Sequence, residues 1–257
     1  MKGWNWKAFF EYLVSPYLLQ GAWTTVWLTA ASIAIGLVLG LIAALMRMSK
    51  NPLVNGPARF YIWLWRGTPL LVQLIIIYTG LPQLGIRLNV IQSALLGMGV
   101  NEGAYLSEII RAGILSVDKG QFDAARALGM NYRKMMQVVI LPQAARVIIP
   151  PLGNSFNGLL KTSSLASVIS MEELLRRSQL LIQAKFAVLE IFLVAALYYL
   201  ALTTIWGAIQ RRIEAYFGRG HVPSPTRKVQ LKRIAEARGS AAMREEVDRR
   251  LLEQDIR

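Results

Sequence analysis

The chain has 257 residues, of which 54% are hydrophobic and only 17% are charged. Soluble domains usually carry about a quarter charged residues, and polar positions break their apolar runs every few residues. The composition therefore favours a membrane protein over a soluble protein with a large core. The formal net charge of +14 raises the question of nucleic-acid binding, which the distribution of the cations along the chain must answer.

Cysteine is absent, which excludes disulfide frameworks, thiolate metal sites and cysteine nucleophiles. The single histidine, His221, follows the last apolar segment and stands between Gly220 and Pro223, close to the charged end of the chain. A solvated tail residue is the natural interpretation, and a histidine-based metal site or catalytic base is not indicated.

Residues 1–20 mix aromatic and polar side chains, a pattern typical of an interfacial segment that tryptophan and tyrosine anchor at the lipid headgroups. Residues 21–46 contain no charge, and roughly 20 apolar residues in a helix cross the hydrocarbon core of a bilayer. This run predicts the first spanning helix. It is too long for a secretory signal and ends at Arg47 without a cleavage site, so we expect it to remain in the mature protein.

Four further spans are predicted: residues 60–81, 90–113, 144–170 and 186–207. The predicted fold class is an all-α integral membrane protein with about five spanning helices. Residues 21–217 form the membrane domain, which includes a cytoplasmic segment at residues 118–142, and residues 218–257 form a charged tail.

The cations fit a topology with the N-terminus outside and the C-terminus in the cytoplasm. In this arrangement the segments expected inside are residues 47–59, 111–146 and 211–257, and the last of these alone holds twelve of the 29 Lys and Arg residues. An excess of Lys and Arg on the cytoplasmic side is the usual rule for membrane proteins. Topology therefore accounts for most of the basicity, and no nucleic-acid partner is expected.

The segment from Gly153 to Gly158 has the glycine spacing of a phosphate-binding loop, but the next residues do not fit. Such a loop needs Lys and then Ser or Thr directly after its second glycine. Here Leu159 and Leu160 intervene before Lys161. If ATP drives this protein, another chain binds it.

The stretch DAARALGMNYRKMMQVVILP, residues 123–142, lies in the predicted cytoplasmic segment. Asp123 suits a helix N-terminus, because a carboxylate there complements the free amide groups. Ala124 and Ala125 favour a helix and leave a small surface that another protein can approach closely. Gly129 is suited to a left-handed helix stop.

After this glycine, Asn131 is suited to cap a second short helix, which Pro142 is expected to end. The segment has no nucleophile–base pair and no metal-binding cluster. From the residues alone, it is either a docking element for another protein or an ordinary loop between spans.

The same stretch resembles the cytoplasmic signature of ABC importer membrane subunits, which reads Glu-Ala-Ala, three residues, Gly, nine residues, Ile, any residue and Leu-Pro. Asp123 and Val139 replace the Glu and Ile, and the spacing is intact. The residues to which the resemblance assigns contact with the ATPase, as the coupling helix, are Asp123, Ala124, Ala125, Gly129, Leu141 and Pro142.

Three other segments resemble the polar amino acid permeases of the histidine, glutamine and arginine branch: RGTPLLVQL at 66–74, GAYLSEIIRAGI at 103–114 and LPQAARVIIPPLGN at 141–154. The resemblance covers most of residues 21–210. It implies a type I importer fold in the bacterial inner membrane, a second permease subunit that is identical or a sister chain, and a substrate-binding protein. It also implies a dimer of ATPases that bind ATP and Mg²⁺, an amino acid or a derivative as substrate, and no cofactor or enzymatic activity in this chain.

The third predicted span contains Glu102, Glu108 and Arg111. Ionisable residues within a span are costly and usually face a cavity or a partner. Glu108 and Arg111 are three residues apart and are predicted to form a structural ion pair, with a substrate contact as the alternative. Glu102 has no cation three or four residues away, so we expect it to face the translocation path together with Tyr105.

Lys161, Thr162 and Ser163 complete the expected substrate path, with small-residue helix packing as the alternative role for the hydroxyl groups. Members of the family that the chain resembles commonly have an aspartate where this chain has Thr162. That difference argues against a strict preference for a cationic amino acid.

Two other classes of function are weighed against an ABC permease. A secondary transporter would use Glu102 or Glu108 as the carboxylate for a proton or sodium ion. An integral membrane enzyme would show clustered His, Cys or paired carboxylates at one interface, and the sequence contains no such cluster.

Overall fold

The computed structural model describes residues 4–218, and residues 4–217 belong to one compact unit. Every regular element of this part of the chain is helical. The predicted tail, with His221, lies outside the described residues except for Gly218, and so do the first three residues of the predicted interfacial segment.

The chain begins with a short helix, α1 (Trp6–Leu13), which the Asn5 side chain caps by accepting a hydrogen bond from Ala8 N at 3.1 Å. Helix α2 (Pro16–Arg47) covers the first predicted span and starts five residues before it. Proline suits the first turn of a helix because its missing N–H group would have no partner there.

The prediction of one continuous span at residues 60–81 is wrong. Helix α3 (Pro52–Gly67) ends at a break, and the chain continues at an angle of 103° as α4 (Leu70–Ile75), the π-helix η1 (Ile76–Gly80) and the 3₁₀ helix η2 (Leu81–Leu84). Pro69 explains the break, because a residue before proline is disfavoured in the helical conformation. Thr68 is extended, with φ −121° and ψ 146°.

Two buried amides bind the carbonyl groups that this break leaves free. Gln73 Nε2 donates to Trp65 O at 2.9 Å and to Thr68 O at 3.1 Å. Asn101 Nδ2, from the next long helix, donates to Trp65 O at 3.0 Å and to Gln73 Oε1 at 2.9 Å. The bend is therefore held by side chains from both sides, since buried polar groups need partners.

Helix α5 (Val90–Leu115) packs along α2, and small residues allow the two backbones to approach closely. A Cβ atom added to Gly103 of α5 would lie 2.9 Å from Leu39 Cβ of α2 and 2.6 Å from Tyr61 Oη of α3. At Gly40 of α2, an added Cβ would lie 3.0 Å from Leu106 Cβ. These glycines set the distance between the two helices.

After α5 come α6 (Lys119–Ala127), α7 (Tyr132–Met135), the π-helix η3 (Met136–Ile140), α8 (Leu141–Thr162) and the 3₁₀ helix η4 (Ser163–Ile169). The prediction that Pro142 ends a short helix is wrong, because the chain stays helical from Tyr132 to Ile169. Pro142 lies in the first turn of α8, directly after the π turn.

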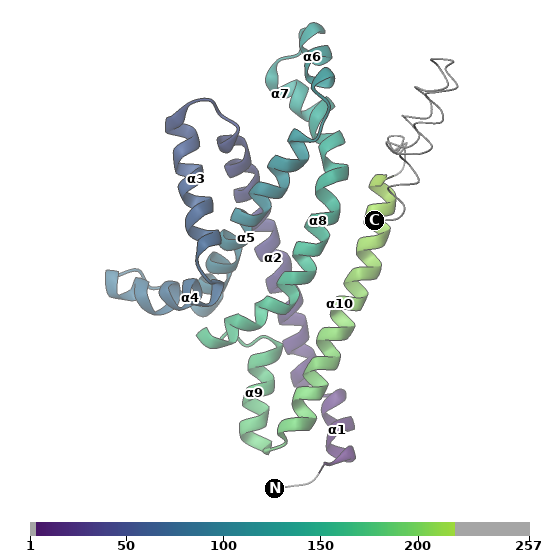
Figure 1. Ribbon diagram of the computed structural model, residues 1–257. Helices are drawn as coiled ribbons and strands as arrows, with labels where there is room; N and C mark the ends of the chain where they lie inside the picture. The colour runs from purple at the N-terminus through teal and green to yellow at the C-terminus, as the bar shows by residue number, and fades with distance from the viewer. Residues whose placement is uncertain (1–3, 219–257) are drawn as a thin grey trace, which may run out of the picture. The chain divides into compact units, whose positions relative to one another are not determined.

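Helix α9 (Leu174–Lys185) was not predicted, and α10 (Val188–Gly218) extends the last predicted span towards the C-terminus by eleven residues, from 207 to 218. Glu173 caps α9 by accepting from Leu175 N at 3.0 Å and Arg176 N at 2.8 Å. Figure 1 shows α2, α5, α8 and α10 running lengthwise, with α6 and α7 at one end and α1 and α9 at the other.

Within residues 4–218, three helical segments are long and apolar enough to cross a membrane: Pro16–Arg47, Tyr132–Ile169 and Val188–Phe217. The bent pair from Pro52 to Leu84 makes a fourth if it counts as one span. Helix α5 is not among them, although its 26 residues extend for about 39 Å, because its polar residues lower its hydropathy. It packs against α2, α3 and α8.

Candidate coupling surface and translocation path

The predicted coupling region, residues 118–142, begins with a small helical unit made of α6 and α7. Its N-terminal cap is Asp118, whose side chain accepts from Gly120 N at 2.7 Å. The placement of Asp123 at a helix N-terminus is therefore wrong. Asp123 lies in the second turn of α6, is exposed, and pairs with Arg126 at 3.2 Å. Its carboxylate is thus available on the surface of the unit.

A glycine turn joins the two helices of this unit. Gly129 has φ +69°, in the left-handed region that favours glycine. Gly129 N donates to Arg126 O at 2.9 Å, and Met130 N donates to Ala125 O at 3.1 Å. This pair of hydrogen bonds is the Schellman arrangement that ends a helix. An added Cβ at Gly129 would meet no atom within 4 Å, so the constraint comes from the backbone alone.

The alanines of α6 face different surroundings. Ala124 is exposed, whereas Ala125 is only 2% exposed and packs into the apolar cluster that joins the unit to α5 and α8. Ala125 is therefore not part of the outer surface, contrary to its interpretation as a contact residue. Its small side chain instead lets α6 lie close to Met135 and Ile140.

Two residues that the sequence reasoning missed give this unit an apolar outer surface. Leu128 is 76% exposed and Tyr132 is 59% exposed, on either side of Gly129. Large apolar side chains exposed together mark an interaction site for another protein or for a membrane. Their position beside Gly129, which the sequence marks as a turn, is the feature from which their exposure could have been predicted. Leu141 is half-buried and Pro142 is exposed at the start of α8.

Glu108 and Arg111 form an ion pair, with Arg111 Nη2 2.8 Å from Glu108 Oε2. Arg47 at the end of α2 also approaches this carboxylate, with Nη2 3.6 Å from Oε1. The sequence reasoning missed Arg47, because its contact with Glu108 depends on the packing of α2 against α5. The arrangement links the ends of the two helices near the coupling unit.

Glu102 lies on another part of α5 and is 8% exposed. Its Cβ would be 3.2 Å from a Cβ added to Gly36 of α2, and Ser155 of α8 approaches its carboxyl group. The side chain therefore sits where α2, α5 and α8 meet. Tyr105, one turn further along α5, is 42% exposed.

The other predicted path residues lie near the far end of α8. Lys161 and Thr162 are exposed, and Thr162 Oγ1 donates to Gly158 O at 3.2 Å. Ser163 is buried, and its hydroxyl donates to Leu160 O at 2.8 Å, so this hydroxyl is used within the helix. Lys161 is six residues beyond Ser155, about 9 Å along α8. The structure therefore separates these residues from Glu102.

The segment from Gly153 to Gly158 is helical and forms no phosphate-binding loop. Instead, carbonyl groups near the prolines of α8 accept hydrogen bonds from α10. Trp206 Nε1 donates to Gly153 O at 2.8 Å, and Gln210 Nε2 lies 3.4 Å from Pro150 O. The ring of Phe156 stacks on Trp206 with centroids 3.7 Å apart. These contacts join α8 to α10.

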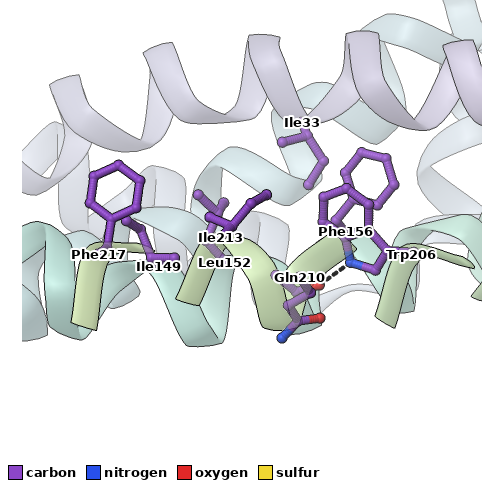
Figure 2. Close-up of a pocket in the computed structure, with 9 residues that line it drawn as sticks. Ile33, Ile149, Leu152, Phe156, Trp206, Gln210, Ile213 and Phe217 are labelled. Atoms are coloured by element: carbon purple, nitrogen blue, oxygen red, sulfur yellow. Dashed lines mark hydrogen bonds between the residues drawn. The ribbon is translucent and has the colours of Figure 1, made fainter. Parts of the chain in front are cut away.

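Figure 2 shows an apolar cavity beside these contacts, with a volume of about 290 Å³. Its lining residues come from α2, α8 and α10: Ile33, Ile149, Leu152, Gly153, Phe156, Trp206, Gln210, Ile213 and Phe217. The one polar side chain, Gln210, already donates to Glu214 at 2.8 Å. A polar substrate would find few partners here, so the cavity is not the candidate path. Among residues 4–218, no three His, Asp or Glu side chains gather as a metal site.

The sequence of this chain matches known transport proteins. Residues 36–217 match the family model described as binding-protein-dependent transport system inner membrane component. The arginine transport system permease protein ArgU of Corynebacterium glutamicum is 38% identical over 253 residues, covering 93% of this chain and 80% of that protein. The L-cystine permease TcyB of Bacillus subtilis is 43% identical over 209 residues, covering 79% and 89%.

The glutamine permease GlnP of Escherichia coli is 37% identical over 212 residues, covering 82% of this chain and 96% of that protein. Among solved structures, an amino acid ABC transporter crystallised with histidines matches with a TM-score of 0.77 and 36% identity, covering 84% of this chain and all of that chain. The inward-facing methionine transporter MetNI, at 18% identity and a TM-score of 0.69, supports the fold alone. The chain therefore belongs to the family of binding-protein-dependent transport system inner membrane components, with the fold of a type I ABC importer transmembrane domain, and it is a membrane permease subunit rather than an enzyme.

Proposed function

We propose that this permease moves amino acids, or amino-acid derivatives, into the bacterial cytoplasm by alternating access. The observation that carries the proposal is the similarity of most of the chain to permeases whose names specify arginine, cystine and glutamine. These three amino acids differ in side-chain charge and size. The shared substrate class is therefore the amino acid, and the similarity does not identify the side chain of the substrate.

The unit of α6 and α7 is the proposed contact with a dimer of ATPases, which bind ATP and Mg²⁺ in place of this chain. Leu128 and Tyr132 supply exposed apolar anchors, while Asp123 supplies an exposed carboxylate. Movement of the ATPases reaches the spans because Ala125 and its neighbours pack this unit onto α5 and α8. The residues proposed to couple the two proteins directly are Asp123, Ala124, Leu128, Gly129 and Tyr132.

The proposed assembly contains a second permease, either a copy of this chain or a sister chain, and a substrate-binding protein on the outside. The cationic segments support an orientation with the C-terminus and the coupling unit in the cytoplasm and the N-terminus outside. Native mass measurement of the purified assembly distinguishes a pair of identical permeases from a mixed pair.

Glu102 is the proposed polar contact along the path, together with Tyr105 and the exposed Lys161 and Thr162. A buried carboxylate between three helices needs a partner or a proton. We expect Glu102→Gln to lower the apparent affinity for substrates, because the attraction for the α-ammonium group is removed. Unchanged affinity and an unchanged order of substrate preference would remove Glu102 from the path.

The function is tested by rebuilding the permease with its partner proteins in liposomes and recording ATP hydrolysis and uptake across a panel of amino acids. An ABC importer requires both rates to rise together for the transported amino acid. Uptake that continues without ATP but stops when the ion gradient collapses would identify a secondary transporter, and the proposed coupling role of α6 and α7 would fail.

A further inference from the structure

One partly buried carboxylate of α5 pairs with two guanidinium groups and lies within electrostatic reach of a third. Glu108 pairs with Arg111 at 2.8 Å and with Arg47 at 3.6 Å. Arg66, at the end of α3, lies close enough to Glu108 to interact with it electrostatically. The cluster carries three positive charges and one negative charge, so it retains an excess of positive charge.

Arg66 is held differently from the other two cations. Its guanidinium carbon lies 5.2 Å from the centre of the Tyr105 ring, which places the group over the face of the ring. Among the described residues, no carboxylate lies within ion-pairing distance of Arg66. The side chain is exposed, so its N–H groups are open to a partner that is not part of this unit.

This exposed face is a polar one within the membrane domain. Charged side chains in such a domain face a water-filled cavity or a partner, since exposure to lipid is costly. Tyr105, Glu108 and Arg111 lie at intervals of three residues and share one side of α5. The side that holds Arg66 therefore borders a polar space and not the hydrocarbon.

We propose that Arg66, positioned by the ring of Tyr105, binds the carboxylate group of the transported molecule. A cation–π contact with the ring holds the guanidinium by its positive charge, so its N–H groups can still donate to a substrate. Those groups match the two oxygen atoms of a carboxylate in a bidentate pair. The excess positive charge of the cluster also attracts an anionic group.

This inference rests on the proposed transport of amino acids and specifies which part of them is recognised. The carboxylate is common to all amino acids, so contact with Arg66 selects the class without selecting a side chain. A substrate whose carboxylate is replaced by a carboxamide keeps the amino group and the side chain but loses the bidentate pair. The site therefore predicts discrimination between an amino acid and its amide.

The test uses the permease–ATPase assembly without the substrate-binding protein, because that protein would impose its own selectivity. Calorimetry measures the affinity for the amino acid that the uptake panel identifies and for its carboxamide. We expect Arg66→Ala to weaken binding of the amino acid roughly 10- to 100-fold, the range for loss of a hydrogen bond to a charged group, and to weaken carboxamide binding much less, because the carboxamide is uncharged and offers one acceptor oxygen. Arg66→Lys should restore part of the affinity, and Tyr105→Leu should give an intermediate loss.

Arg59→Ala is the matched control, because Arg59 is another exposed arginine of α3 and lies two turns earlier. It should bind both ligands as the unchanged protein does. Equal losses for the amino acid and its carboxamide in Arg66→Ala, or no loss, would overturn the proposal. Dissociation of the two permeases in this variant, detected by native mass, would assign Arg66 to the subunit interface instead. Absence of ATP-driven uptake in the unchanged protein would contradict the proposed function separately.

Discussion

At the residue scale, Glu173 shows how hydrogen bonds stabilise a buried carboxylate. It is fully buried and accepts three hydrogen bonds, from Leu175 N, from Arg176 N and, at 2.7 Å, from the hydroxyl of Tyr199. It therefore joins the start of α9 to α10. A carboxylate suits this position because it only accepts hydrogen bonds, and all three neighbours donate.

We expect Glu173→Gln to destabilise the protein by about 1–3 kcal/mol, because the amide group places a donor against other donors. The melting temperature of the purified protein in detergent checks this. The matched control is Glu172→Gln, since Glu172 is exposed and its pair with Arg177 at 3.5 Å lies near the surface. The control should change stability by less than about 0.5 kcal/mol. Equal melting temperatures for the two variants would show that Glu173 contributes no more than a surface carboxylate.

Gly129 is the second position where we expect a single substitution to have a large effect, in this case on the coupling of ATP hydrolysis to transport. Its φ of +69° makes any side chain unfavourable, although Asn and Asp tolerate this conformation better than most residues. We expect Gly129→Asp to reduce transport per ATP hydrolysed, because it adds a charge beside the apolar anchors Leu128 and Tyr132. Gly129→Asn separates the two effects, since it has the same shape without the charge. Wild-type assembly and transport in the aspartate variant would contradict the coupling role.

At the element scale, proline positions shape the long helices in two ways. Both π turns stand directly before a Leu-Pro pair, η1 before Leu81-Pro82 and η3 before Leu141-Pro142. Proline lacks an N–H group and its ring crowds the carbonyl group four residues earlier. The wider π turn gives that carbonyl group room, so the helix continues. At Pro69, in contrast, the chain turns by 103° and buried amides bind the free carbonyl groups.

The α2–α5 contact gives a prediction at the same scale. Alanine normally stabilises a helix relative to glycine by about 1 kcal/mol. At Gly103, however, the added Cβ would lie 2.6 Å from Tyr61 Oη, so Gly103→Ala should lower the melting temperature. Gly56→Ala is the control, because a Cβ there meets no atom within 4 Å and should not lower stability. An increase of the melting temperature in both variants would show that the two helices separate easily.

At the scale of the whole molecule, the topology can be tested because the chain has no cysteine and any introduced cysteine is labelled without background. Lys185, the last residue of α9, and Arg133, in α7, are both exposed and lie near opposite ends of the bundle. We expect Lys185→Cys to react with a membrane-impermeant maleimide on intact spheroplasts. Arg133→Cys should react only after permeabilisation. The reverse pattern would invert the proposed orientation.

The fold class, the first and last spans and the glycine stop at Gly129 follow from the sequence alone. These features depend on local properties, namely hydrophobic length, charge distribution and backbone preference, which a chain carries without its tertiary contacts. The resemblance to ABC importer permeases likewise rested on a local spacing from Asp123 to Pro142. The comparisons confirm that family and fold.

Which side chains meet depends on the tertiary packing of the helices. A proline lies at both the break after Gly67 and the uninterrupted helix at Pro142, so the residue type alone does not predict the difference. At the break, Gln73 is joined by Asn101, which is 28 residues away in the sequence. The inward position of Ala125 depends on packing against Met135 and Ile140. The cation–π contact of Arg66 with Tyr105 joins separate helices. Such contacts form between segments that are far apart in the sequence, and local sequence preferences do not specify how those segments pack.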